Sequence, residues 1–399
     1  MAREKTTLPL GLYLHIPFCK SKCIYCDFYS LPRSEEKMDD YVAALSAHLE
    51  ETAPMARRHT VDTVYLGGGT PSYLGAERLT KLLQTVKKSY RVDKHAEVTL
   101  EANPDSLPEA KELRSLRRQG LNRVSLGVQS SDDEVLRALG RIHTWQQVVD
   151  AVSAVRRAGI KNLSVDLIYG LPGQTMAQWE KTLDDVLSLQ PEHISCYGLK
   201  VEEGTPLWKN REQLILPDDD LQADMYLFCV ELLQRMGYEQ YEISNFARPG
   251  HESRHNLKYW TLGEYAGFGP GAHSDFGGVR YAYIRDLDRY LQGRLILSES
   301  ETITQDERER EYLMLSLRTA AGMDVQTFER RFRQRFSVLE PLLKGYAAHG
   351  LAQPTERGWR LTPKGFLVSN AIISSLIDAL AEEKKRRVEK ALRGDYRII

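Results

Sequence analysis

Three cysteines lie close together near the N-terminus and could hold an iron–sulfur cluster. Cys19, Cys23 and Cys26 have the spacing Cys-x3-Cys-x2-Cys. Three thiolates bind three irons of a 4Fe–4S cube and leave the fourth open, and an open iron can bind a reactant. A structural zinc ion would need a fourth ligand. The nearby His15 is poorly placed for that, because it lies inside a strand pattern just before Pro17. The spacing therefore favours an open 4Fe–4S cluster over zinc or a chance group of core cysteines.

A second set of residues could hold a charged small molecule beside the open iron. The run 67–71, Gly-Gly-Gly-Thr-Pro, lets a ligand approach backbone groups closely. Arg141 could grip a carboxylate with its guanidinium. Gln129 and Asp166 are candidates for contacts to hydroxyl groups, and Glu101 for a contact to a cation or a hydroxyl. Taken singly, the glycines could form a tight turn, and each polar residue could be a surface salt-bridge residue.

Six short β-type runs, each followed by an amphipathic helical pattern, predict a parallel sheet with helices outside it. The β-type runs are 12–16, 63–66, 97–100, 123–128, 163–168 and 193–197. The helical patterns are 37–52, 75–89, 108–119, 145–158, 174–189 and 218–236. Because no GxGxxG fingerprint is present, a partial (β/α)6 barrel is favoured over a Rossmann fold. The cysteines, glycines and polar candidates fall at the ends of successive strands or close to them, where barrel enzymes place their chemistry.

The rest of the chain suggests three parts. We expect the barrel at 1–236, a β- and loop-rich segment covering the barrel mouth at 237–302, and a helical domain at 303–399. In the last part, residues 351–371 predict a β-hairpin followed by a helix, which is a winged-helix-like pattern. Such a module is more often a structural lid than a DNA reader, and the basic run 384–387 is interpreted as a solvated helix face.

Composition and charge narrow the class of protein. The net charge is −1, so nothing global indicates nucleic acid or an anionic membrane as partner. The sequence shows neither a signal-peptide core in its first ten residues nor a long apolar span, so we expect a cytoplasmic protein. In a reducing compartment, cysteines are ligands or buried thiols rather than disulfides. Cys196 and Cys229 lie in apolar segments and are predicted to be packing residues.

Taken together, these motifs resemble the radical S-adenosylmethionine (SAM) superfamily and, within it, the oxygen-independent coproporphyrinogen III oxidase-like family. The narrower resemblance rests on the segments at 15–19, 67–72, 127–130, 140–143, 166–175 and 241–247. It implies a 4Fe–4S cluster on the three cysteines, with SAM on the open iron. It also implies that SAM is surrounded by Tyr13, Tyr25, Gly68, Gly69, Thr70, Glu101, Gln129, Arg141 and Asp166.

Two departures shift the resemblance within that family. Coproporphyrinogen dehydrogenases carry a further Cys-x-Cys and an N-terminal extension, whereas here Asp27 and Phe28 follow the third cysteine and about ten residues precede the first strand. The run 255–260 instead matches the His-Asn-x-x-Tyr-Trp motif of HemW-type haem chaperones, which bind haem and pass it to apo-haemoproteins. By this resemblance His255 ligates haem iron, while Tyr259 and Trp260 offer flat apolar surfaces.

Other readings of this stretch remain open from the residues alone. His255 could be bonded within a loop with its aromatic neighbours in the core. Lys258 or Arg254 could pair with haem propionates. His251 and His255 spell the zinc-protease pattern His-Glu-x-x-His, but that chemistry needs both histidines on one helix face, and no amphipathic periodicity surrounds them. His273 is either a further site residue or a turn histidine.

The sequence therefore predicts a haem chaperone carrying a SAM-bound 4Fe–4S cluster, with haem and apo-haemoproteins as partners. The first alternative is an oxygen-independent coproporphyrinogen III oxidase, which decarboxylates propionates oxidatively. A DNA-linked regulator using the winged-helix-like part is the second alternative. If SAM is cleaved, an electron donor is a further partner, and peripheral membrane contact is left open.

Overall fold

The computed structural model describes residues 7–392, which form two compact units. Among these residues, the first unit contains 7–239, 244–258 and 263–302, and the second contains 240–243, 259–262 and 303–392. None of the helices within 7–392 is long and apolar enough to cross a membrane.

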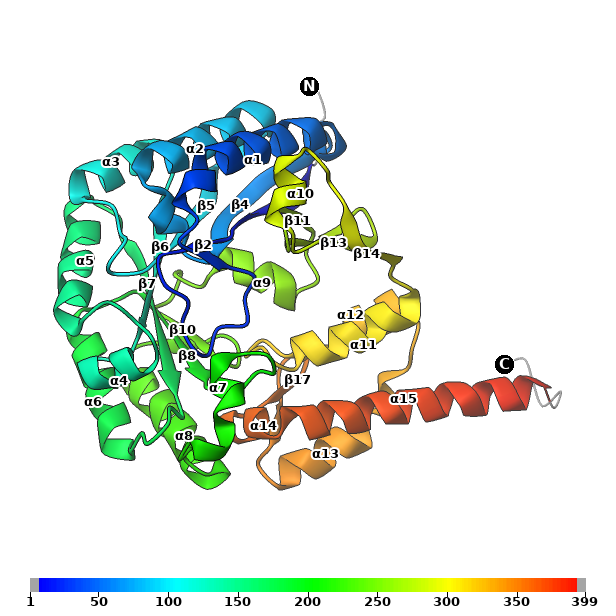
Figure 1. Cartoon of the computed structure of the whole chain (residues 1–399). Coiled ribbons are helices and arrows are strands. Elements are labelled where there is room, and N and C mark those ends of the chain that lie inside the picture. The colour runs from blue at the N-terminus through cyan, green and yellow to red at the C-terminus, as the bar shows by residue number, and fades with distance from the viewer. Residues whose placement is uncertain (1–6, 393–399) are drawn as a thin grey trace. The chain divides into compact units, whose positions relative to one another are not determined.

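The first unit is the predicted barrel of alternating strands and helices. Its parallel strands are β1 (Leu8–Ile16), β4 (His59–Gly68), β5 (Val92–Ala102), β6 (Arg123–Gln129), β7 (Asn162–Tyr169) and β8 (His193–Gly198). The predicted helices are α1 (Met38–Thr52), α2 (Ala76–Ser89), α3 (Ala110–Arg118), α5 (Trp145–Arg157), α6 (Met176–Ser188) and α8 (Asp219–Arg235). Figure 1 shows these helices along the outer side of the strands. In the sequence, the short α4 (Asp133–Ala138) follows β6 and precedes α5. The six β/α units are therefore confirmed.

The two faces of this sheet differ in chemistry because side chains alternate along a strand. On β1, Leu10, Leu12 and Leu14 are fully buried, whereas Tyr13 and His15 point to the other face. On β5, the alternate residues Glu97, Thr99 and Glu101 share that second face, which is polar although it is buried. This polar face positions the functional residues.

The segment 237–302 is rich in strands, as expected, but these strands extend the sheet instead of covering the barrel mouth. Strand β10 (Asn245–Ala247) pairs antiparallel with β8 at one edge. At the other edge β11 (Tyr265–Phe268) pairs parallel with β1, followed by β12 (His273–Phe276), β13 (Val279–Tyr283) and β14 (Leu297–Thr302). Two helices not predicted from the sequence also occur here, α9 (Arg254–Trp260) and α10 (Leu287–Leu291). An exposed strand edge must be paired or protected, which explains why the segment joins the sheet.

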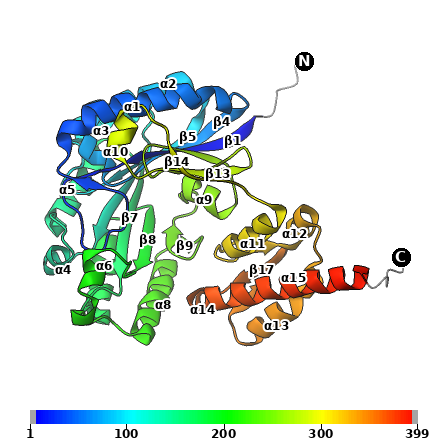
Figure 2. The same cartoon turned by 45° about the vertical axis from the view of Figure 1, so that its right-hand side comes forward.

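The second unit is mostly helical (Figure 2). Its helices are α11 (Gln305–Ser316), α12 (Val325–Phe332), α13 (Glu340–Ala348), α14 (Pro363–Leu367) and α15 (Ser369–Leu392). The predicted hairpin is confirmed as β16 (Ala352–Pro354) and β17 (Gly358–Leu361), to which β15 (Met323–Asp324) adds a strand. In the basic run of α15, Lys384 pairs with Asp306 and Glu309, so this run is partly neutralised.

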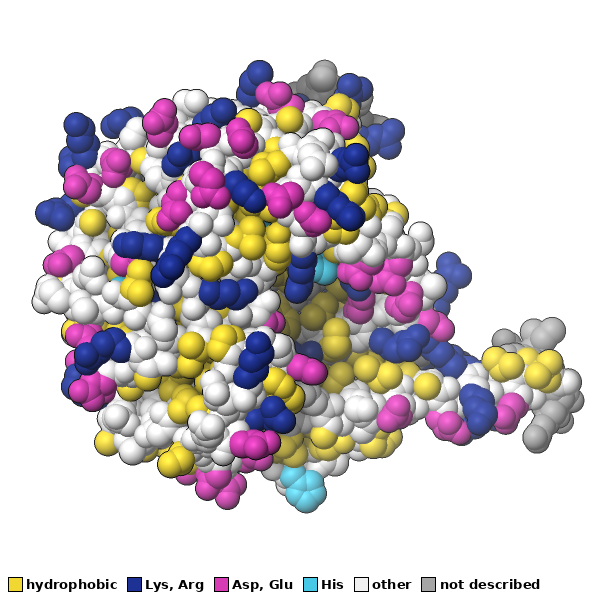
Figure 3. Space-filling model, in the orientation of Figure 1, with side chains coloured by type: hydrophobic (Ala, Val, Ile, Leu, Met, Phe, Trp, Pro, Cys, Tyr) yellow, Lys and Arg dark blue, Asp and Glu magenta, His cyan; other side chains and the backbone are white. Residues whose placement is uncertain are grey.

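Charged side chains of both signs are interspersed over the face of the molecule drawn in Figure 3, in line with the near-zero net charge.

The two cysteines outside the N-terminal triplet, Cys196 and Cys229, are buried with their Sγ atoms 3.4 Å apart. The prediction that they are packing residues is therefore confirmed.

Candidate functional site

A cavity of about 670 Å³ opens at the C-terminal ends of the barrel strands, and all three cysteines line it. It lies wholly within the first unit. The wall also contains eight of the nine residues predicted to surround SAM: Tyr25, Gly68, Gly69, Thr70, Glu101, Gln129, Arg141 and Asp166. Residues far apart in the sequence are thus brought together by the sheet.

The cysteines lie on the loop that follows β1. Cys19 ends the short strand β2 (Phe18–Cys19) and is buried, whereas Cys23 and Cys26 are half-buried. Desolvation raises the pKa of Cys19 and raises the pKa of Cys26 to about 11. A thiolate in such a place needs positive charge nearby, which a bound metal would supply.

The glycine run packs so closely against the cysteine loop that a side chain on Gly69 would not fit. A Cβ on Gly69 would lie 2.8 Å from the Phe18 carbonyl oxygen and 3.0 Å from Cys19 Sγ. The neighbouring Thr70 hydroxyl donates to Cys19 Sγ at 3.5 Å. The loop therefore packs against the first cysteine and brings backbone groups to the cavity, as the glycine pattern predicted.

Arg141 links the cysteine loop to the strand ends. Its guanidinium donates to Cys23 Sγ at 3.5 Å, to Asn103 Oδ1 at 3.0 Å and to the Gly127 carbonyl oxygen. Its Nε is buried without a hydrogen-bond partner. A Cβ on Gly127 would lie 2.8 Å from Arg141 Nη2, so a larger residue there would displace the guanidinium from this position. A buried cation with an unpaired donor beside the cavity is suited to bind a carboxylate.

Two half-buried carboxyl groups line the cavity, Glu101 from β5 and Asp166 from β7. Glu101 accepts hydrogen bonds from the Tyr65 hydroxyl at 2.7 Å and from the Gly68 N–H at 3.0 Å. Burial, with a smaller contribution from Asp166, raises the pKa of Glu101 to about 7. Burial also raises the pKa of Asp166, which accepts from the Ser125 hydroxyl at 3.0 Å. Both groups can accept hydrogen bonds from the hydroxyls of a ligand.

Tyr13 is the one predicted SAM residue that the cavity wall does not include. Its hydroxyl is 3.0 Å from His15 Nδ1, while His15 Nε2 is 2.9 Å from the Tyr29 carbonyl oxygen. Because a carbonyl only accepts, Nε2 carries the proton and Nδ1 accepts from Tyr13. Both His15 nitrogens are thus occupied, so His15 is not poised to complete a zinc site with the cysteines.

The histidine motif lies in helix α9, and the first residue of the motif, His255, is deeply buried. His255 is 1% exposed, its Nδ1 is 2.8 Å from the Thr63 hydroxyl, and its backbone N–H donates to Glu97 at 3.0 Å. Desolvation lowers the pKa of His255 to about 3, so its imidazole is neutral. The next residue, Asn256, lines the cysteine cavity.

The other motif positions are less buried than His255. Tyr259 and Trp260 are half-buried and are grouped by their packing with the second unit. The cations suggested for propionates already have partners: Lys258 pairs with Asp62 at 2.7 Å, and Arg254 donates to the His95 carbonyl oxygen at 2.8 Å.

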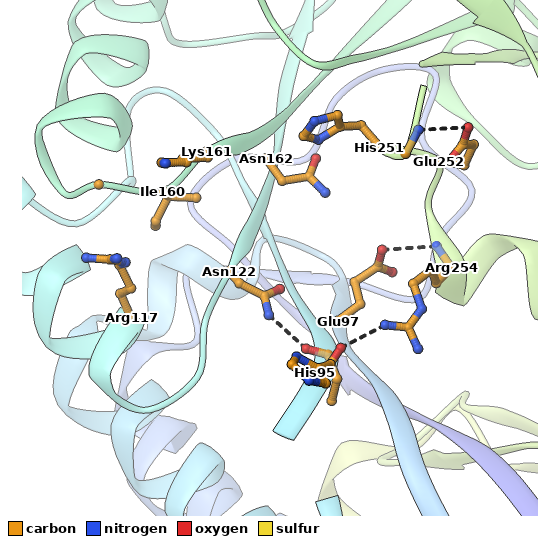
Figure 4. A pocket seen from close by; sticks show the side chains of 13 residues that line it. His95, Glu97, Arg117, Asn122, Ile160, Lys161, Asn162, His251, Glu252 and Arg254 are labelled. Atoms are coloured by element: carbon orange, nitrogen blue, oxygen red, sulfur yellow. Dashed lines mark hydrogen bonds between the residues drawn. The ribbon is translucent and has the colours of Figure 1, made fainter. Parts of the chain in front are cut away.

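The zinc-protease pattern lacks its required geometry. His251 lies before α9, which starts at Arg254, so the two histidines do not share a helix. Figure 4 shows His251 in a separate pocket of about 490 Å³, together with Arg117, Lys161 and Asn162. Within residues 7–392, no group of three or more His, Cys, Asp or Glu side chains is arranged to hold a single metal ion. His273 is exposed on β12, 3.4 Å from Glu299, and is not part of the cysteine cavity.

Several cavity residues were missed by the sequence reasoning. Tyr65 and Arg123 line the cavity, and Arg123 is 1% exposed with its Nε unpartnered. Ser125 and Ser195 also lie on the wall. The signal was the alternation on β4, β6 and β8, which places polar residues on one buried face at every second position.

Comparison with known proteins first identifies the superfamily to which the barrel is similar. Residues 13–186 match the Radical SAM superfamily, and residues 303–368 match the HemN C-terminal domain. The solved structure of the coproporphyrinogen III oxidase HemN from Escherichia coli, described as a radical SAM enzyme, superimposes with a TM-score of 0.81. It is 27% identical in sequence, and the match covers 94% of this chain and 91% of that one.

Curated relatives then give the particular family. The haem chaperone HemW of Bacillus subtilis is 35% identical over 376 residues, which are 92% of this chain and 99% of the relative. HemW of E. coli is 35% identical over 371 residues, covering 92% of this chain and 97% of that protein. The chain therefore belongs to the HemW family of the radical SAM superfamily.

Proposed function

We propose that this protein is a haem chaperone that binds haem, delivers it to apo-haemoproteins and carries a SAM-bound 4Fe–4S cluster. The observation that supports it best is the similarity to HemW chaperones along nearly the whole of both chains. The complete motif His255-Asn256-x-x-Tyr259-Trp260 supports it further. In this proposal the cytoplasm is the place of action, His255 ligates haem iron, and Tyr259 and Trp260 contact the macrocycle.

The residues on the cavity wall fit the cluster and SAM. Cys19, Cys23 and Cys26 would hold three irons, and the fourth iron would accept the amine and carboxylate of SAM. When bound and reduced, such a cluster supplies the electron that cleaves SAM. Arg141 would bind the SAM carboxylate, because its buried Nε is unpartnered beside Cys23. The backbone at Gly68 and Gly69 would hold the amine.

The remaining wall residues would orient the nucleoside part of SAM. Asp166 and Gln129 would accept or donate hydrogen bonds at the ribose hydroxyls, and Glu101 would accept one from a hydroxyl or an ammonium group. Thr70 and Tyr25 would close the site beside the cysteines, since both line the cavity. Tyr13 would act from behind the wall through His15.

The oxidase reading is favoured by one observation, the likeness to the HemN structure over most of both chains. In that case the same cavity would hold coproporphyrinogen III, and SAM cleavage would be productive. Reduced, cluster-loaded protein would then form protoporphyrinogen from coproporphyrinogen III and SAM without oxygen. An electron donor would be a required partner for this reaction, but not for haem delivery.

Anaerobic titration of haem into the cluster-loaded protein, with and without SAM, tests the proposal. We expect a shifted Soret band that saturates at one haem per chain and transfers to an added apo-haemoprotein. Absence of saturable binding, or protoporphyrinogen formation in the oxidase assay without haem transfer, would overturn the chaperone proposal. Repeating the titration with anionic vesicles shows whether membrane contact accompanies haem binding.

A further inference from the structure

We propose that Tyr65 is a positioning residue that couples the cysteine cavity to His255, so that a ligand in the cavity favours release of the buried histidine. This inference rests on the proposed function, because it takes His255 to be the haem ligand. It assigns a role to a residue that the sequence motifs do not include.

Haem iron cannot reach His255 in the packed state. The side chain is 1% exposed and is held from several sides. Its Nδ1 is 2.8 Å from the Thr63 hydroxyl, and Glu97 accepts the backbone N–H groups of Arg254 and His255, both at 3.0 Å. Figure 4 shows the Glu97–Arg254 contact. For the imidazole to bind iron, the first turn of α9 must leave these partners, so α9 has a packed and a released state.

The packed state fits tightly against the sheet. A Cβ on Gly11 would lie 2.8 Å from Lys258 Cδ and 3.1 Å from His255 Cε1. Further along α9, Lys258 pairs with Asp62 at 2.7 Å, and only 9% of the Lys258 side chain is exposed. Packed interfaces of this kind switch between discrete arrangements instead of deforming gradually.

Tyr65 connects this packed helix to the cavity. Its ring stacks on the His255 ring, with the centroids 5.1 Å apart and the planes 25° from parallel. Its hydroxyl donates to Glu101 Oε1 at 2.7 Å, and both Tyr65 and Glu101 lie on the cavity wall. One side chain therefore touches the histidine with its face and the cavity carboxylate with its hydroxyl.

The Tyr65 ring and the Glu101 carboxylate have little room to move independently of each other. A Cβ on Gly67 would lie 2.9 Å from Tyr65 Cε1 and 3.0 Å from Glu101 Oε2. Glu101 has one oxygen committed to Tyr65 and the other to the Gly68 N–H. A ligand hydroxyl that approaches Glu101 competes for the oxygen used by Tyr65. The Tyr65 ring then shifts, and its stacking on His255 weakens.

Tyr90, a buried tyrosine with no part in either site, provides a control. Its hydroxyl donates to the Leu49 carbonyl oxygen at 2.9 Å, and its ring packs against Phe268 with the centroids 6.1 Å apart. The cavity wall does not include it. Tyr65→Phe and Tyr90→Phe each remove one hydrogen-bonded hydroxyl and keep the ring, but only the first breaks a contact to the cavity.

The test compares haem dissociation constants with and without saturating SAM in cluster-loaded protein. We expect SAM to tighten haem binding about fivefold or more in the wild type and in Tyr90→Phe, which is the usual lower range for coupled sites. In Tyr65→Phe the ratio should fall to within about twofold of unity, a change smaller than that range. Iron content and circular dichroism show whether each variant is folded and loaded. A Tyr65→Phe protein that keeps the wild-type ratio would overturn the inference.

A second measurement needs no variant. Without haem, SAM should speed amide hydrogen exchange at Arg254 and His255, because their N–H groups lose Glu97 on release. Unchanged exchange in the wild type would also overturn the inference. If haem does not bind at all, the proposed function fails. If haem binds and SAM changes neither its affinity nor the exchange, the coupling alone fails.

Discussion

Two glutamates on one face of β5 have different hydrogen-bond partners, and this difference distinguishes two layers of the barrel. Glu97 accepts two backbone N–H groups of α9 and fastens that helix to the sheet. Glu101 accepts from Tyr65 and Gly68 and faces a cavity of about 670 Å³. We call the residues around Glu97 the α9 layer (Thr63, Tyr65, Glu97 and His255). The cavity that Glu101 lines is the cysteine cavity. The chain itself fills the α9 layer, whereas the cysteine cavity is left open for a ligand.

This comparison shows that a buried polar residue does not by itself mark a binding site. His255 and Glu97 are more deeply buried than the half-buried carboxyl groups of the cavity, but protein groups satisfy them. In the cavity, Arg141 and Arg123 each keep a buried Nε without a partner. Unmade hydrogen bonds in a cavity point to a ligand, because they are costly to leave unmade.

The largest expected effect comes from removing the cysteines of the cavity. The variant with Cys19, Cys23 and Cys26 all changed to Ala should contain almost no iron after anaerobic reconstitution and should lack the visible iron–sulfur absorbance. Changing Cys196 and Cys229 to Ala is the matched control and should leave the iron content unchanged, because these thiols pack away from the cavity. Iron retained by the triple variant would contradict the cluster assignment.

The next effect tests the α9 layer. His255→Ala should weaken haem binding at least tenfold, about 1.4 kcal/mol, and alter the Soret band, because the iron loses its imidazole. Thr63→Val removes the hydroxyl beside Nδ1 but keeps the imidazole, so it should retain haem binding. Spectrophotometric titration of both variants measures this. Unchanged affinity in His255→Ala would place the axial ligand elsewhere.

Arg141→Ala should weaken SAM binding roughly tenfold or more, about 1.5–3 kcal/mol for a lost charge-assisted hydrogen bond. The cluster should survive, because the three thiols remain. Isothermal titration calorimetry on reconstituted protein gives the affinity. Arg137→Ala, on the exposed side of α4, is the control and should bind SAM like the wild type. Equal affinities for the two variants would reject the carboxylate role of Arg141.

The cavity was easier to predict from the sequence than the α9 layer, for a physical reason. Cys19 and Gly69 belong to short motifs that follow strands, and a parallel sheet necessarily gathers its strand ends at one edge. The burial of His255 depends on Gly11, Thr63 and Glu97, which come from three strands and show no local pattern. We predicted that strands β10 and β11 cover the barrel mouth, but they flank the parallel strands within the sheet. Pairing partners that are distant in the sequence leave no periodic signal.

The last prediction tests the Glu101 carboxyl group of the cysteine cavity through the pH dependence of stability. Burial raises the pKa of Glu101 from an ordinary 4.5 to about 7, so the folded protein binds this proton more tightly than the unfolded chain. The stability contributed by the proton is complete below pH 4.5 and is lost as the pH rises through 7. Glu101→Gln removes that dependence. Relative to the wild type without SAM, the variant should therefore gain up to about 3 kcal/mol of unfolding free energy between pH 4.5 and pH 8.

Denaturant unfolding of the wild type and Glu101→Gln across this range measures the difference, and other titrating groups cancel in it. Glu97→Gln is the matched variant on the same face of β5. It weakens the acceptor for two N–H groups of α9, so it should lower the free energy of unfolding. A difference between the wild type and Glu101→Gln that stays constant across the pH range would contradict the raised pKa of Glu101. Glu101 would then be ionised in the empty cavity, so the carboxylate that accepts from Tyr65 would carry its full charge before any ligand binds.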